Sequence, residues 1–299
     1  MIIRFFKFTK LLQLGAAIII SILIMLAFKN VNNLLFDIYS LILLVVIFFI
    51  SFFIISKNSI LKNNQYVSLG LIIFCGIYFK TPSDLSLTAS YLFLLFSVRR
   101  IYSLKSKKNQ SKKLFDIGFW FLISIILSPI NLFFIITILS GTFIFYKISP
   151  VVILKIVAGM LTASLMTLFL LDLTANISLT PDYLIYIVDQ TWIKYTSSDI
   201  FPKDNFSHWL FAFVSFLIFL YYSFRFFGNN LAERLKNLFL LTFFINSILL
   251  AFVINEYSIF LFFPFLVTLV KIISELKDNL FFEIAVLIAI ILNSYPYNI

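Results

Sequence analysis

The sequence is poor in charged residues. Only 12% of its 299 residues are Asp, Glu, Lys or Arg, whereas 62% are hydrophobic. Soluble domains carry roughly twice that charged fraction, because a soluble chain of this length needs a polar shell. The composition therefore excludes a soluble globular enzyme, and its high hydrophobic content also excludes a disordered chain.

The residue types that build common catalytic and metal sites are scarce as well. Cys75 is the one cysteine, which excludes a disulfide scaffold, and we expect it to pack among apolar neighbours. His208 is the one histidine, so no ligand set of the zinc type is present. Seven glycines leave little material for loops that cradle phosphate, and the HExxH, CxxC and GxSxG motifs do not occur. We therefore expect no metal and no cofactor.

Long apolar runs are what the sequence has in abundance. A helix crosses the roughly 30 Å hydrocarbon core of a bilayer with about 20 residues. The runs predict an all-α polytopic transmembrane helical bundle with about 11 spans, which form a single membrane domain over residues 1–299. The expected spans are 11–28, 34–56, 66–79, 85–98, 114–128, 130–146, 151–171, 206–227, 235–254, 257–271 and 280–292. The segments 66–98 and 114–146 read as short hairpins, and whether they cross fully is left open.

Lysine and arginine determine the expected direction, because short loops rich in these residues stay in the cytoplasm. The predicted loop 99–113 has no acid and contains Arg99, Arg100, Lys105, Lys107, Lys108, Lys112 and Lys113. If this loop is cytoplasmic and successive loops lie on alternate sides of the membrane, the N-terminus is inside and the C-terminus is outside. Most of the 23 basic residues then lie inside. The net charge of +10 is thus explained by topology, and no nucleic-acid partner is needed. Anionic lipid headgroups at the cytoplasmic face are the expected partner.

The longest predicted external segment is 172–205. It is too long for a simple turn, and its functional interpretation is a lid over an external cavity. The candidate acid or base groups on that side are Asp84, Asp182 and His208. The alternative is a solvated loop with aromatic anchors at the membrane interface.

The spans contain uncharged polar residues but no acid or histidine near their centres, which argues against an ion-driven carrier. The deep polar residues are Ser124, Thr162, Ser164, Thr167, Asn246 and Ser247. We expect them to form hydrogen bonds between helices. The alternative is that Asn246 lines a substrate cavity.

One stretch of the sequence resembles a known family. It is SVRRIYSLKSKK at 97–108, continued by KKLFDIGFW at 112–120, and the opening MIIRFF is also similar. These segments resemble an uncharacterised family of multi-pass inner-membrane proteins of Bacteroidota. The resemblance implies a bacterial inner-membrane location and supplies no activity or catalytic residues. From the residues alone, we expect Asp116 to pair with a neighbouring cation and Trp120 to lie in the aromatic belt of the interface.

Two functions remain open from the sequence. The first is a non-enzymatic component or partner subunit of a cell-envelope process, which docks through the cations of 99–113 on lipid headgroups or on a membrane-protein partner. The alternative is a membrane-embedded enzyme of the glycosyltransferase or polymerase type that acts on a lipid-linked saccharide at the outer face, with Asp84, Asp182 and His208 as candidate residues. External arginines would grip pyrophosphate in such an enzyme, whereas all five arginines here are predicted inside.

Overall fold

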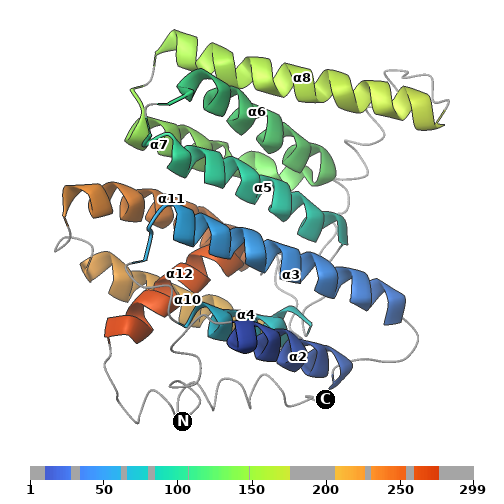
Figure 1. The fold of residues 1–299 in the computed structure, drawn as a ribbon, viewed down its shortest axis with the longest axis vertical. Helices are drawn as coiled ribbons and strands as arrows, with labels where there is room; N and C mark the ends of the chain where they lie inside the picture. The colour runs from blue at the N-terminus through green and yellow to red at the C-terminus, as the bar shows by residue number, and fades with distance from the viewer. Residues whose placement is uncertain are drawn as a thin grey trace. The chain divides into compact units, whose positions relative to one another are not determined.

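The computed structural model describes residues 11–27, 34–61, 66–79, 85–106, 108–147, 149–175, 206–225, 230–253 and 259–275. Every regular element in these ranges is helical, as the sequence predicted (Figure 1). The elements are α2 (Leu11–Ala27), α3 (Leu34–Lys57), α4 (Val67–Tyr78), α5 (Leu85–Ser103), α6 (Gln110–Leu127), the 3-10 helix η2 (Pro129–Phe134), α7 (Ile135–Phe145), α8 (Pro150–Ala175), α10 (Phe206–Arg225), α11 (Leu231–Val253) and α12 (Phe262–Glu275).

The chain forms two compact units. The first unit combines Met1–Thr88 with Lys203–Ile299, and the second unit is Ala89–Pro202. Each unit is described by itself below. The expectation of one continuous membrane domain stays a prediction.

The core of the first unit is built around α12, whose residues from Phe262 to Val270 are all buried. Phe262 packs edge-on against Phe74 of α4, with ring centroids 4.7 Å apart. Pro264 lies in the first turn of α12, where the missing N–H removes no helical hydrogen bond. The α-helix accordingly begins at Phe262, after a short 3-10 turn at 259–261, and not at 257 as the apolar run predicted.

Cys75 belongs to the packing of the first unit, as predicted. Its side chain is completely buried on α4, and its Sγ lies 3.6 Å from the carbonyl oxygen of Ser21 on α2. The thiol is therefore shielded from solvent.

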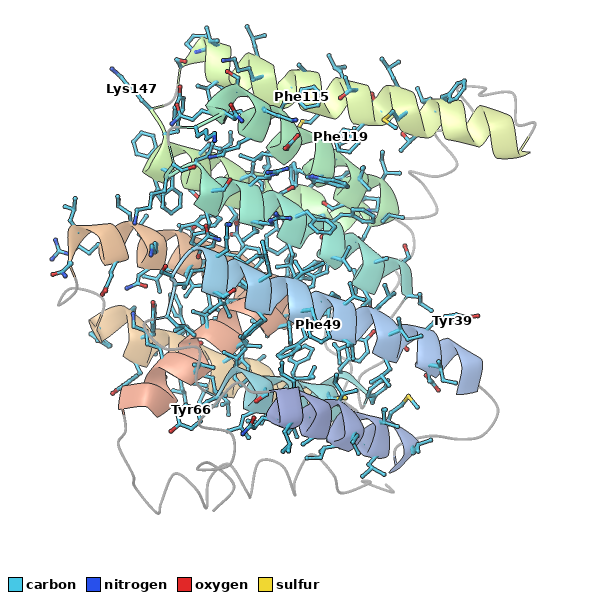
Figure 2. The ribbon with its side chains drawn as sticks, viewed as in Figure 1. Tyr39, Phe49, Tyr66, Phe115, Phe119 and Lys147 are labelled. Carbon is cyan, nitrogen blue, oxygen red and sulfur yellow. The ribbon has the colours of Figure 1, made fainter. Side chains whose placement is uncertain are left out.

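The second unit contains the close pair α6 and α8, which run side by side (Figure 1). Gly118 of α6 lies against the carbonyl of Ile156, and Gly159 of α8 lies against the carbonyl of Phe115. A Cβ atom at either glycine would collide with the opposing carbonyl oxygen. Figure 2 labels Phe115 and Phe119 on the α6 side of this crossing. Glycine at these two positions therefore allows the two backbones to touch.

The chain breaks after α6 where the sequence predicted an apex. Ser128 is extended, with φ −151° and ψ 106°, because the following Pro129 disfavours the helical region for the residue before it. The Asn131 amide donates to the carbonyl oxygen of Ser124 at 3.0 Å and so covers one open end of α6. The next α-helix begins at Ile135 rather than at 130, since Pro129–Phe134 forms a 3-10 helix.

Two predicted loop boundaries were wrong. α5 continues past its apolar span to Ser103, and α6 begins at Gln110, so the loop predicted at 99–113 is a short connection over 104–109. Arginine and lysine are good helix formers, which lets both helices extend beyond the apolar runs. α8 likewise continues to Ala175, so the first residues of the external segment predicted at 172–205 are helical. Residues 176–205 lie outside the described residues.

Three helices in the described ranges are long and apolar enough to cross a membrane, over Asp37–Lys57, Pro150–Phe169 and Glu233–Ala251. The described residues therefore do not reach the expected count of 11 spans. The 12 residues of α4 extend over only about 18 Å at 1.5 Å per residue, which is too short for a full crossing. The last expected span, 280–292, lies outside the described residues.

The prediction that deep hydroxyl groups join neighbouring helices was wrong. The hydroxyls of Ser124, Thr162, Ser164, Thr167 and Ser247 donate to carbonyl oxygens three or four residues earlier in their own helices. A serine or threonine can reach these carbonyls without any partner helix, which is why a polar hydroxyl alone does not identify a helix contact.

Candidate functional site

The acid and base candidates of the predicted outer side are not brought together by the described structure. Asp84 and Asp182 lie outside the described residues. His208 belongs to the first turn of α10, and its side chain is likewise outside what the structure describes. The lid over an external cavity therefore stays a prediction.

The basic residues of 99–113 are mostly described, and two of them are used to hold α5 and α6 together. The Arg100 guanidinium forms an ion pair with Asp116 at 2.8 Å, as predicted for Asp116 from the sequence. One turn away, the Ser97 hydroxyl donates to the carbonyl oxygen of Ile117 at 3.1 Å. The basic end of this helix pair is thus fixed by one ion pair and one buried hydrogen bond.

Lys113 is the second basic residue with an internal role. Its Nζ donates to the carbonyl oxygens of Ser103 at 2.7 Å and Ser106 at 2.9 Å. An ammonium in this place satisfies carbonyls at the C-terminus of α5 and complements the negative end of the helix dipole. Burial and the nearby Arg100 lower the pKa of Lys113, and the same two causes lower the pKa of Arg99.

Lys155 adds α8 to this end of the second unit. Its Nζ donates to the Ser111 hydroxyl at 2.8 Å, and so links the second turn of α8 to the first turn of α6. A contact between residues 44 positions apart leaves no local signal in the sequence.

Three lysines on the connection and the first turn of α6 remain available. Lys105, Lys108 and Lys112 are exposed and have no ion-pair or hydrogen-bond partner within the described part of the chain. Lys107 lies outside the described residues. Asn109, in the left-handed conformation with φ 53°, ends the connection, a place where asparagine is tolerated. We call Lys105, Lys108 and Lys112 the basic surface.

The basic surface presents three exposed ammonium groups. Exposed ammonium groups attract phosphate and carboxylate groups by an electrostatic force that salt screens. Among the described residues no three His, Cys, Asp or Glu side chains gather in a way that would hold a metal ion. The chemistry that the described basic end supports is therefore the binding of anions.

A second polar cluster, which sequence reasoning missed, lies in the first unit. Tyr222 of α10, Asn237 of α11 and Lys271 of α12 meet there, and the Tyr222 hydroxyl donates to Asn237 Oδ1 at 2.6 Å. Lys271 Nζ lies 3.4 Å from the Tyr222 hydroxyl and 5.0 Å from the centroid of its ring. The three residues come from three helices, so only the packing of these helices reveals the cluster.

Comparisons with protein-family models, with curated proteins and with solved structures gave no match to this chain.

Proposed function

We propose that this chain is a multi-pass protein of the bacterial inner membrane and a non-enzymatic component or partner subunit of a cell-envelope process. Apolar side chains that face outward support the membrane location. Leu154, Leu161, Leu165 and Phe169 of α8 are each about 60% exposed or more, and Phe49 of α3 is 44% exposed (Figure 2). Side chains of this kind are expected to contact lipid, because water does not favour broad apolar surfaces. The resemblance of segments 97–108 and 112–120 to Bacteroidota inner-membrane proteins supports the same location.

The proposed topology has about 11 spans, with the N-terminus in the cytoplasm and the C-terminus outside. It rests on the distribution of lysine and arginine. Contacts within the first unit are in accord with it, because they join residues predicted on the cytoplasmic side. Lys236, near the start of α11, donates to the carbonyl oxygen of Ser59, just after α3, at 2.7 Å. Lys271 and Tyr222 meet near the ends of α12 and α10 that are also predicted inside.

The basic surface carries the proposed function. In this topology Lys105, Lys108 and Lys112 face the cytoplasmic leaflet, whose anionic lipids attract each nearby lysine by about 1 kcal/mol. The observation that carries the proposal is that the basic residues at this end have two different roles. Arg100 and Lys113 hold the helices together, whereas the three lysines of the basic surface have no partner in the described residues.

A triple substitution tests this function. Lys105, Lys108 and Lys112 are changed to Gln, and the matched control changes the exposed Lys57, Lys147 and Arg234 to Gln, which removes the same charge elsewhere. Figure 2 shows Lys147 projecting from the connection before α8. Anionic lipids and membrane-protein partners that co-purify with the full-length protein are then counted by mass spectrometry. We expect the first variant to lose partners that the control retains, and equal retention by both would contradict the proposal.

The enzyme alternative keeps its candidates Asp84, Asp182 and His208 as predictions. No observation in the described residues favours it over the docking function.

A further inference from the structure

A cluster of four half-buried aromatic side chains lies where α5 and α6 meet in the second unit. It consists of Phe93 and Phe96 of α5 and of Phe119 and Trp120 of α6. The ring centroid of Trp120 lies 5.8 Å from that of Phe93 and 5.1 Å from that of Phe96. Phe119, labelled in Figure 2, meets Trp120 edge-on at 5.1 Å. Because none of the four side chains is buried, part of this aromatic cluster is open to the surroundings of the helix pair.

The indole N–H of Trp120 has no hydrogen-bond acceptor within the residues that the structure describes. The rings packed around it carry no oxygen or nitrogen. An indole N–H that leaves water usually finds an acceptor, because an unmade hydrogen bond costs free energy in an apolar environment. The indole nitrogen also keeps some exposed surface. An acceptor from outside the helix pair is therefore expected at Trp120.

The ion pair of Arg100 and Asp116 lies one helical turn from the aromatic cluster, toward the basic end. Phe96 precedes Arg100 by four residues and Trp120 follows Asp116 by four, which corresponds to about 6 Å along each helix. The Arg100 side chain is 34% exposed, and its Nη2 lies 2.8 Å from Asp116. A guanidinium has five N–H donors, and this ion pair is the one contact of the guanidinium within the described residues. Arg100 therefore has donors left for a second acceptor.

These two groups match the two polar parts of a membrane phospholipid, the phosphate and the ester carbonyls beneath it. The interfacial layer of a bilayer is about 5–8 Å thick on each side of the hydrocarbon core. A step of about 6 Å therefore leads from the level of the phosphate to the level of the esters. We infer that α5 and α6 bind an anionic phospholipid, whose phosphate accepts hydrogen bonds from Arg100 and whose ester carbonyl accepts from Trp120 Nε1. Its acyl chains lie along Phe93 and Phe96.

The local charge favours an anionic headgroup over a zwitterionic one. Asp116 is the one acid in segment 97–120, which contains Arg99, Arg100 and five lysines. A zwitterionic headgroup brings a cation of its own, which these residues repel. A guanidinium also suits phosphate, because its planar fork can donate two parallel hydrogen bonds. The inference rests on the proposed membrane location, but Arg100 and Trp120 do not belong to the basic surface.

Two variants that break the same ion pair from opposite sides test this site. Arg100→Gln removes the guanidinium, whereas Asp116→Asn removes the competing carboxylate and leaves the guanidinium in place. Lys57→Gln is the control for net charge, because it removes one positive charge from an exposed position of the first unit. Short-chain phosphatidylglycerol is titrated into the full-length, detergent-purified protein, and bound lipid is measured by native mass spectrometry.

We expect Arg100→Gln to weaken the binding of phosphatidylglycerol by about tenfold or more, because charge-assisted hydrogen bonds are lost. Asp116→Asn should bind the lipid at least as tightly as the unmodified protein, and Lys57→Gln should bind it equally well. Equal weakening by Arg100→Gln and Asp116→Asn would overturn the site, because the lost ion pair alone would explain it. Equal weakening by Arg100→Gln and Lys57→Gln would also overturn it, because only net charge would then matter.

The ester contact has a test of its own. Trp120→Phe keeps an aromatic ring but removes the N–H, so it should weaken the binding of phosphatidylglycerol by about two- to tenfold. It should not change the binding of an ether-linked analogue, which has no ester carbonyl. An equal effect on both lipids, or no effect on either, would overturn this contact.

Two further comparisons define the headgroup and the position of the site. Phosphatidylcholine should bind the unmodified protein more weakly than phosphatidylglycerol, and equal binding would overturn the anionic headgroup. The triple Gln variant of the basic surface should still bind phosphatidylglycerol. Loss of binding in the triple variant together with retention in Arg100→Gln would assign the lipid to the basic surface and overturn the inference. Since the titration is done in detergent, its failure is distinct from a failure of the proposed topology or of the docking function.

Discussion

Replacing Gly118 with alanine should separate α6 from α8. The added Cβ would collide with the carbonyl oxygen of Ile156, and the Ile156 carbonyl carbon and Cα lie close behind it. All three are backbone atoms, so no flexible side chain can move aside. Gly159→Ala meets the same obstacle from the other helix, because its Cβ would collide with the carbonyl oxygen of Phe115. Either variant must shift a whole helix.

The size of the effect follows from two opposing contributions. Alanine favours a helix over glycine by up to about 1 kcal/mol. Overpacking a close contact costs about 1–3 kcal/mol, and more when backbone must move. We therefore expect a net loss of about 1–3 kcal/mol for Gly118→Ala and for Gly159→Ala.

Two other glycines complete a graded series. A Cβ at Gly15 of α2 has nothing within 4 Å, so Gly15→Ala should leave stability unchanged or raise it slightly. A Cβ at Gly70 would lie 3.2 Å from the Leu266 side chain, which can adjust, so Gly70→Ala should fall between the extremes. The assay is the temperature at which half of the detergent-solubilised protein is lost from the monodisperse peak. A midpoint of Gly118→Ala equal to that of Gly15→Ala would refute the proposed α6–α8 contact.

Three smaller predictions concern the basic end and the apex of the second unit. Asp116→Asn removes the partly exposed ion pair with Arg100, so the melting midpoint should fall by an amount worth at most about 1 kcal/mol, and high salt should shrink the difference. Burial lowers the pKa of Lys113 below its ordinary 10.5, so folding favours the neutral amine. The stability of the protein should therefore rise as the pH increases from that lowered pKa toward 10.5. Melting midpoints measured over this pH range should show no such rise for Lys113→Gln. Asn131→Asp puts a buried carboxylate against the carbonyl oxygen of Ser124. The melting midpoint should fall by an amount equivalent to about 1–3 kcal/mol of stability. An unchanged melting midpoint would show that the amide of Asn131 does not hold the end of α6.

Local sequence signals predicted the helical class and several element limits. The start of α3 at Leu34 and the break at Ser128 follow from an apolar run and from a proline, both of which act on their immediate neighbours. The pairing of Asp116 was also predictable, because a lone acid beside many cations has an obvious partner. Helix ends were less predictable, since polar helix formers carry α5 beyond its apolar span to Ser103.

Contacts between distant residues could not be read from the sequence. Gly118 and Gly159 lie in two different apolar runs, and nothing in either run shows that their backbones meet. The cluster of Tyr222, Asn237 and Lys271 depends on how three helices pack. The hydroxyl groups led to the opposite error, because contacts between helices were predicted where none were needed. A serine such as Ser247 satisfies its hydrogen bond within its own helix.

The side of the membrane on which the basic surface lies tests the central claim most directly. Ser106 is exposed beside Lys105, so Ser106→Cys offers a label site, and Cys75→Ala removes the one native thiol. A membrane-impermeant maleimide is added to intact and to permeabilised cells that express the full chain. The proposed topology predicts labelling of position 106 only after permeabilisation, whereas labelling in intact cells would contradict it and remove the cytoplasmic docking function.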